Sequence, residues 1–381
     1  MKSLWFGWVL VAALPAAAAN FKVTLLAPAV DPRLERTRIE RGALGHPTGP
    51  ALDAIQVALA EGRFELDAAG ATLELTQVAV SDAVAAKAAA AKAEKDGAAA
   101  LITDLPATWT AAASDGTKLP VLNVGTAADA LRQADCRRNL FHLVLSERMR
   151  SDALAQALMA RRWSNVLMLT GPSDADRERS ATAQASIKRY GLKLVASRPF
   201  KLSADPRERE LANTLLLTQG NYDVVWVVDS DGEFALLLPY RTALPRPVVG
   251  DGGMVAVAWS PRFERFGAPQ VTRRLSKAAG RPMGAHDWPA WMAGKALVAA
   301  AVAAPKGPMA AFHKALAEAE LDGSKGVSMS FRTWDGQLRQ PVLLSDGRSV
   351  IDIAPIDGVL HPKNTLDTLG ADAPEKLCKA R

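Results

Sequence analysis

The chain has 381 residues and a formal net charge of +6; 49% of its residues are hydrophobic and 23% are charged. Because the basic residues are scattered and form no long run, the sequence gives no sign of a nucleic-acid partner. The length and apolar content favour two domains with buried cores over a single one.

The first 19 residues, "MKSLWFGWVLVAALPAAAA", follow the order of parts that is typical of a signal peptide. Lys2 supplies the positive start, Leu4–Leu14 the apolar segment, and Ala17–Ala19 an A-x-A cleavage site. The apolar segment is shorter than the roughly 20 residues that cross a bilayer. We therefore predict that residues 1–19 are removed, that the mature chain begins near Asn20, and that it is exported to the periplasm. No cysteine stands at the cleavage site to carry a lipid anchor.

The first half of the mature chain alternates between strand-like and helix-like segments. Strand patterns cover 21–30, 71–80, 98–104 and 119–125, and helix patterns cover 49–62, 81–97 and 146–163. The runs "AAALITD" and "LPVLNVG" are mostly apolar, as expected of buried strands. Such a βαβ series predicts a parallel sheet with helices on both faces.

The same series restarts in the second half. Strands are expected within 165–176, 192–200, 222–234 and 246–253, and helices up to 190 and over 205–217, 268–280 and 287–304. From 326 to 355 the pattern becomes that of a β-hairpin, with turn sequences at Asp335–Gly336 and Asp346–Gly347.

These patterns together predict an α/β protein of two Rossmann-like lobes with parallel sheets, joined by a hinge of several strands. We assign 20–145 to an N-terminal lobe and 146–325 to a C-terminal lobe, whose first helix, 146–163, crosses from the N-terminal lobe. Residues 326–381 are assigned to a β-rich return segment and a tail that cross back to the N-terminal lobe.

The candidate ligand-binding residues stand at or after predicted strand ends, because the crevice of an open α/β sheet lies beyond the carboxyl ends of its strands. They are Arg36, Arg38, Asp104, Trp109, Asn123, Arg148, Asp231, Arg241, Asp251 and Trp259. Guanidinium groups bind carboxylates through paired hydrogen bonds, and tryptophan stacks on flat ligands. For the arginines within 31–42 and 146–152, a solvated surface role with local acidic partners remains open.

The stretch "DSDGE" contains Asp229, Asp231 and Glu233 and follows the apolar strand pattern at 222–228. It lacks the full calcium-loop pattern, because the residues after Glu233 turn apolar and supply no oxygen ligands. A catalytic acid pair is a second alternative. We favour a turn at the strand end in which Asp231 caps the following helix.

No nucleophile-elbow, zinc-protease, dinucleotide or P-loop motif occurs, and the five histidines are far apart. The sequence therefore predicts a binding protein that is not an enzyme and that has no catalytic cofactor or metal.

Cys136 and Cys378 are the two cysteines of the chain. Export to an oxidising compartment favours a disulfide between them, which would tie the C-terminal tail to the first half of the protein. In the chain-entropy view such a link contributes about 4–5 kcal/mol. Two free thiols are the alternative.

Several long strings resemble a known family. They are "LNVGTAADALRQADCRRNLFH" (122–142), "SERMRSDALAQAL" (146–158), "DSDGEFALLLPYRTALPRPVVGDGG" (229–253), "FRTWDGQLRQP" (331–341) and "LDTLG" (366–370). They look like the leucine/isoleucine/valine-binding class of periplasmic type I ABC-transporter substrate-binding proteins. Within that class they resemble a branch associated with alcohol dehydrogenase systems that depend on pyrroloquinoline quinone (PQQ).

The resemblance implies a monomeric receptor with the type I periplasmic binding protein fold, which closes on a small molecule and delivers it to a membrane permease. PQQ is the ligand it indicates first, with the PQQ-dependent dehydrogenase system as a further partner. PQQ is flat and carries three carboxylates, which suits arginine forks and a tryptophan face. Lys201 is the lysine nominated for reversible addition to its quinone carbonyl.

Two alternatives remain at this point. In one, the receptor binds an amino acid or another small carboxylate. In the other, the chain is an exported metal-handling or enzymatic protein centred on Asp229, Asp231 and Glu233.

Overall fold

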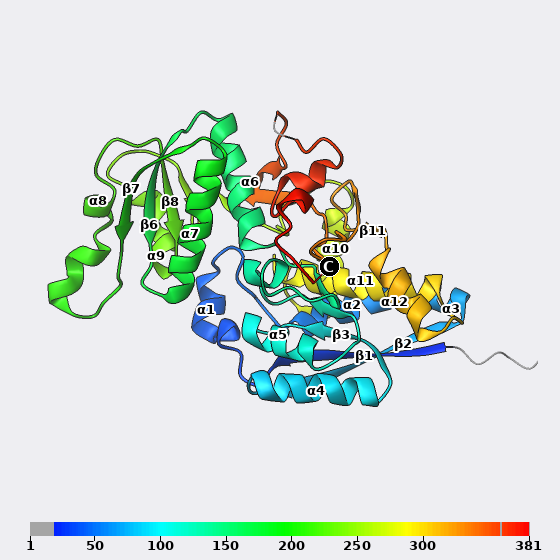
Figure 1. Ribbon diagram of the computed structural model, residues 1–381. Coiled ribbons are helices and arrows are strands. Elements are labelled where there is room, and N and C mark those ends of the chain that lie inside the picture. Colours follow the sequence, from blue (N-terminus) through cyan, green and yellow to red (C-terminus); the bar gives the residue numbers. More distant parts are fainter. Residues whose placement is uncertain (1–18, 359, 381) are drawn as a thin grey trace, which may run out of the picture.

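The computed structural model describes residues 19–358 and 360–380. The predicted signal peptide, 1–19, lies outside this part of the chain except for its last residue. Two α/β lobes lie on either side of the long helix α6 (Glu147–Ala160), as Figure 1 shows. Among the described helices, none has the length and apolar character needed to cross a membrane.

The N-terminal lobe is built on a parallel sheet with strand order β2-β1-β3-β4-β5. Its strands are β1 (Ala19–Pro28), β2 (Ala71–Val80), β3 (Ala98–Thr103), β4 (Val121–Asn123) and β5 (Leu140–His142). One face packs on α4 (Ala83–Lys95) and α5 (Ala107–Asp115), and the other on α2 (Ala51–Glu61), next to which lies α3 (Arg63–Ala69). Strand β3 is buried at every position because helices cover both faces.

The C-terminal lobe repeats this design with a parallel sheet of order β7-β6-β8-β9. Its elements are β6 (Asn165–Thr170), α7 (Asp174–Arg189), β7 (Lys193–Pro199), α8 (Thr214–Leu217), β8 (Val224–Val228), α9 (Glu233–Leu237) and β9 (Val248–Gly250). Helix α7 begins at a capping box, in which Ser173 and Asp176 satisfy each other's backbone N–H groups. Helices α6 and α7 cover one face of the sheet, and α9 covers the other.

Short antiparallel pairs complete the fold. Strands β10 (Val255–Val257), β13 (Val342–Ser345) and β14 (Val350–Ala354) form one sheet, and β11 (Leu321–Asp322) pairs with β12 (Ser328–Met329). The turn between β13 and β14 contains the predicted Asp346–Gly347 sequence. The α/β fold class with two parallel-sheet lobes is therefore confirmed.

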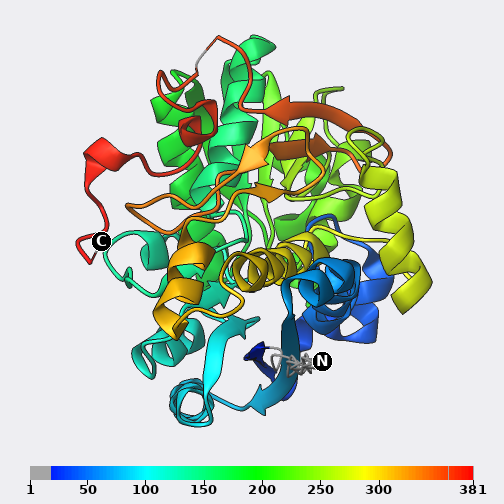
Figure 2. The ribbon, with the colours of Figure 1, turned by 90° about the vertical axis from the view of Figure 1, so that its right-hand side faces the viewer.

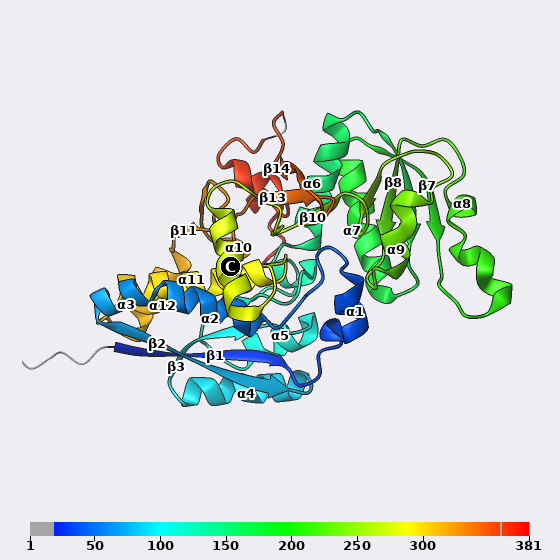
Figure 3. The same cartoon turned by 180° about the vertical axis from the view of Figure 1, so that it is seen from behind.

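The structure places one segment in a different lobe from the sequence-based assignment. Helices α10 (Ala268–Ala279), α11 (Asp287–Ala303) and α12 (Met309–Ala317) pack on the N-terminal lobe, although 146–325 was assigned to the C-terminal one. Figures 1 and 3 show α11 and α12 beside the N-terminal sheet. A Cβ atom on Gly294 would lie 2.6 Å from the Cβ atom of Ala58, so α11 and α2 pack closely at this glycine. Helix α11 is buried around most of its circumference, and its sequence alone does not tell which sheet it covers.

The C-terminal tail is fastened to both lobes. The predicted disulfide between Cys136 and Cys378 is confirmed, with Cα atoms 5.6 Å apart, and it joins the tail to the loop before β5. On the other lobe, the Gly370 N–H donates to the Asp152 carboxylate of α6 at 2.9 Å. Figure 2 shows the red C-terminal segment passing along the outside of both lobes.

The start of this tail is ordered around a buried arginine. Arg332 is 1% exposed, and its guanidinium donates to the Asp367 carboxylate at 2.9 Å and to the carbonyl oxygens of Leu366 and Leu369, each at 2.8 Å. The side chain thus satisfies acceptors that the tail would otherwise bury without a partner.

Candidate ligand-binding site

A cleft between the lobes has two connected compartments. The N-lobe compartment, of about 530 Å3, is lined mainly by residues that follow β1, β3 and β4. The C-lobe compartment, of about 180 Å3, is lined by residues of α6, α7 and the ends of β8 and β9. Both are bordered by Gly45, His46, Glu147, Arg150 and Ser230. The cleft thus lies where the carboxyl ends of the parallel strands predict it.

The base of the N-lobe compartment holds a buried charge cluster. Asp104, at the end of β3, lies 2.8 Å from the Arg33 guanidinium and 3.1 Å from the His286 Nε2 atom. Burial alone would raise the pKa of Asp104, but His286 and Arg33 outweigh it and hold that pKa well below its usual range. Asp104 therefore stays ionised, and it positions two side chains that line the compartment.

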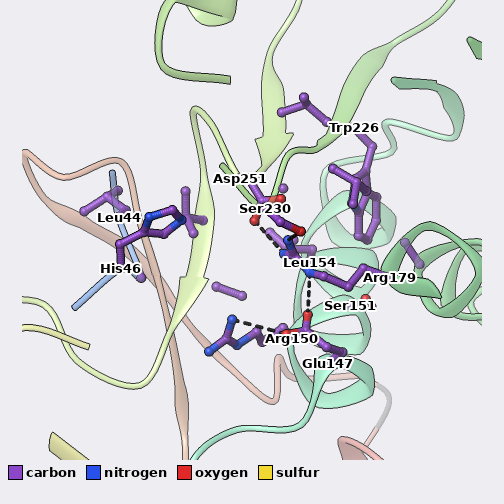
Figure 4. Close-up of a pocket in the computed structure, with 17 residues that line it drawn as sticks. Leu44, His46, Glu147, Arg150, Ser151, Leu154, Arg179, Trp226, Ser230 and Asp251 are labelled. Carbon is purple, nitrogen blue, oxygen red and sulfur yellow. Dashed lines mark hydrogen bonds and ion pairs between the residues drawn. The ribbon is translucent and has the colours of Figure 1, made fainter. Parts of the chain in front are cut away.

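The C-lobe compartment is organised around Arg179 of α7. Its guanidinium lies 3.2 Å from Glu147 and 2.6 Å from Asp251, and it donates to the Ser230 hydroxyl at 3.3 Å. Figure 4 shows Arg179 among these groups, with the apolar side chains of Trp226 and Leu154 in the same lining. Burial lowers the pKa of Arg179, but the two carboxylates outweigh it and leave the pKa raised. Arg179 thus joins α6 and α7 to the ends of β8 and β9.

Charged residues also connect the two lobes directly at the rim of the cleft. Arg38 and Arg41 of α1 (Arg36–Arg41) each lie 2.7 Å from Asp231, and Arg41 lies 2.9 Å from Glu233. We call these contacts the interlobe ion pairs. Between the two acids, Gly232 has a φ of +77°, and a Cβ atom there would lie 2.9 Å from the Ala43 Cβ atom of the N-terminal lobe. A glycine at this position therefore permits the close approach of the lobes.

The "DSDGE" acids are engaged in ways that do not favour a metal or a catalytic pair. Asp231 and Glu233 face arginines, and Asp229 accepts the Ala235 N–H at 2.9 Å. Within the described residues there is no group of three or more side chains that could hold a metal ion. The predicted helix cap at Asp231 is wrong, because Gly232 is the N-cap residue and the carboxylate that bonds the first turn belongs to Asp229.

Several predicted site residues lie at the cleft. Arg38 and Trp109 line the N-lobe compartment, and Asp251 lines the C-lobe compartment. Asp104 lies beneath the lining, and Asp231 lies at the interlobe ion pairs. Asn123 is fully buried and accepts the N–H groups of the loop at 125 and 126, which borders the N-lobe compartment. Its role is to shape that loop.

Five predicted contacts, three arginines here and two further residues below, are corrected by the structure. Arg36 points to solvent and pairs with Glu40 of its own helix. Arg148 turns toward the tail, where its guanidinium lies 2.7 Å from Glu375. Arg241 is exposed outside both compartments.

Trp259 is 1% exposed and packs in the core, with its indole N–H donating to Thr272, so it has no face for a ligand. Lys201 is paired with Glu208 and also lies outside both compartments.

Much of the lining was not predicted from the sequence. The missed residues are Arg33, His46, Glu147, Arg150, Arg179 and His286. Arg33 and Arg150 lie in the two arginine-rich segments singled out above, so charge clustering was a usable signal for them. Arg179 lies within a charged amphipathic helix, and His286 comes from a segment assigned to the other lobe; neither carries a local signal.

Comparisons with known proteins bear on the fold. A scan of protein-family models and a search of curated proteins each found no match. Solved structures match over most of the chain. An ABC transporter substrate-binding protein from Sphaerobacter thermophilus aligns with a TM-score of 0.70 at 15% identity, covering 88% of this chain and 98% of that one. The chain has the type I periplasmic binding protein fold.

Two further structures share the type I fold with this chain. An R. palustris solute-binding protein in complex with benzoate aligns with a TM-score of 0.65 at 17% identity, covering 88% of this chain and 96% of that one. A leucine-, isoleucine-, valine-, threonine- and alanine-binding protein from Brucella ovis aligns with a TM-score of 0.68 at 14% identity, covering 86% of this chain and 89% of that one. At these identities the likeness establishes the fold.

We expect His46 to make the stability of the fold depend on pH. Burial, with Arg38 and Arg179 nearby, lowers the pKa of His46, although Asp251 opposes the shift. The folded state therefore binds fewer protons than the unfolded state as the pH falls below about 6.5, and stability is lost over that range. We expect His46→Gln to remove part of the fall in melting temperature between about pH 6.5 and pH 5. In a series of thermal melts, His361→Gln serves as control, and identical slopes for His46→Gln and the wild type would contradict this expectation.

Proposed function

We propose that the chain is an exported solute-binding receptor of an ABC transporter, which captures an anionic aromatic small molecule in the interlobe cleft. The observation that carries the proposal is the composition of that cleft. Arginines of both lobes line it, namely Arg33, Arg38, Arg150 and Arg179, and Trp109 borders the same space. Arginine forks suit carboxylates, and an indole face suits a flat ring.

The arrangement of the lining supports capture by closure. A ligand in the cleft touches N-lobe groups such as Trp109 and groups of α6 and α7 at the same time. Contacts with both lobes are complete only when the lobes are together, so the ligand stabilises that state by its differential affinity. The permease can then distinguish the ligand-bound receptor from the empty one by the closed arrangement of its lobes. This role is capture and delivery, and it requires no chemistry on the ligand.

PQQ is the specific ligand that we propose, on the strength of the sequence resemblance described above, with its dehydrogenase system as a functional partner. The binding of benzoate by a structural neighbour supports the wider class of aromatic carboxylates. The combined compartments fall in the range of about 300–1,000 Å3 that is usual for small-molecule sites.

A thermal-shift series combined with fluorescence titration tests the proposal. PQQ should raise the melting temperature by mass action and quench tryptophan emission. Trp109→Phe should remove much of the quenching, whereas Trp163→Phe, outside both compartments, should not. The proposal fails if neither PQQ, benzoate nor 3,4-dihydroxybenzoate stabilises the wild-type protein at tens of micromolar.

An amino-acid ligand is the second candidate, favoured by the amino-acid-binding neighbour from Brucella ovis. The α-ammonium group of an amino acid needs a carboxylate partner, but Glu147 and Asp251 in the cleft are both paired with Arg179. Leucine and alanine belong in the same ligand series. If leucine alone stabilises the protein, the proposed ligand changes from an aromatic carboxylate to an amino acid, and the proposed receptor function still stands.

A further inference from the structure

The arginines of the cleft differ in how fully they are paired. Arg33 lies within 2.8 Å of both Asp31 and Asp104, Arg38 lies 2.7 Å from Asp231, and Arg179 lies between Glu147 and Asp251. Arg150, like Arg38, has a single carboxylate partner among the described residues, but that partner, Glu147, lies farther away, at 3.4 Å. It is therefore the least engaged guanidinium of the cleft.

Within the part of the chain that the structure describes, we find no hydrogen bond along one edge of the Arg150 guanidinium. The contact with Glu147 uses Nη1, and within the described residues the buried Nε atom has no hydrogen-bond partner. Nε and Nη2 form the edge that binds a carboxylate through two parallel hydrogen bonds. A buried donor without an acceptor costs free energy, so the arrangement is incomplete until an acceptor arrives.

The neighbouring carboxylates do not accept hydrogen bonds from the Nε and Nη2 edge of Arg150. Glu147 directs its second oxygen to Arg179, and Asp251 is held by the same arginine. Arg150 lies in the first turn of α6, where the partial positive charge of the helix end also favours an anion. The side chain borders both compartments, so a group bound there lies where the two compartments meet.

We infer that Arg150 is the anchor for a ligand carboxylate and that it restricts the receptor to carboxylate ligands; this rests on the proposed function. The Nε and Nη2 edge donates two hydrogen bonds to one carboxylate, and the ring of the ligand occupies the N-lobe compartment that Trp109 also borders. A neutral isostere such as a primary amide presents one oxygen and one NH2 group, so it leaves part of this edge unpaired. Arg150 thus selects carboxylate over amide.

Calorimetric titration of three variants tests this anchor with PQQ and benzoate as carboxylate probes and benzamide as the neutral probe. Arg150→Gln should weaken carboxylate binding about 10- to 100-fold, as the loss of hydrogen bonds to a charged group does. It should leave benzamide almost unaffected. Arg150→Lys keeps the charge but not the fork, and should restore only part of the affinity. Arg36→Gln, a solvent-facing arginine, is the matched control and should bind as the wild type does.

The melting temperature of the Arg150→Gln variant without ligand shows whether Arg150 anchors a ligand or stabilises the fold. Because Arg150 gains its second partner only from the ligand, Arg150→Gln should melt at or above the wild-type temperature without ligand. A clear loss of unliganded stability, or carboxylate binding by Arg150→Gln at wild-type strength, overturns the anchor and leaves the proposed function standing. A wild-type protein that binds neither PQQ nor benzoate overturns the proposed aromatic ligand and the anchor together.

Discussion

Replacing Cys136 and Cys378 together with serine is expected to lower the free energy of unfolding by about 3–5 kcal/mol. The disulfide closes a loop with a sequence separation of 242, so its loss frees a large part of the unfolded chain. It also removes the covalent fastening of the tail to the N-terminal lobe. Urea unfolding of the oxidised wild type and the double variant, followed by circular dichroism, measures the difference.

The reduced wild-type protein is the control for this expectation, since it has the native side chains without the link. It should unfold at the same urea concentration as the double serine variant. Equal midpoints for the oxidised and reduced wild type would contradict the expected stabilisation.

Arg332→Met is expected to destabilise the protein by about 3–5 kcal/mol. The substitution removes the buried cation that binds Asp367 and leaves the carbonyl oxygens of Leu366 and Leu369 without their donor. Buried acceptors that lose their partner keep the full cost of having left water. Thermal and urea unfolding measure the loss, and limited proteolysis of the tail should become faster.

Arg339→Gln is the matched comparison, because Arg339 also donates to Asp367, at 2.8 Å, but from a more exposed position. Its effect should be clearly smaller. If both variants lose the same free energy of unfolding, the burial of Arg332 does not explain its contribution to stability.

The strand and helix order was predictable because the local patterns agree with the fold. Strand β8 is apolar at every position and β3 at every position but Thr103, and a βαβ alternation leaves few topologies once parallel pairing is assumed. The lobe of α11 was not predictable. That helix is apolar on nearly all sides, so its sequence says that it is buried but not which sheet buries it.

The candidate site was predictable only in part. The strand-end rule located Asp104, Trp109 and Asp251, because backbone topology alone brings strand ends together. It failed for Trp259, since the rule does not say whether a side chain points into the crevice or into the core. Arg179 and His286 were missed because ion pairing across distant segments leaves no trace in local sequence.

For the receptor proposed above, the interlobe ion pairs have a consequence for the speed of ligand exchange. Each time the cleft opens, Arg38 and Arg41 separate from Asp231 and Glu233 and return to water. Their mutual attraction is felt mainly within the Debye length, about 8 Å at physiological ionic strength, so added salt weakens these exposed pairs more than it weakens the more buried pairs of Arg179. For that receptor we therefore expect the "DSDGE" turn to affect how often the cleft opens, and the side chains deeper inside to affect how tightly a ligand is bound.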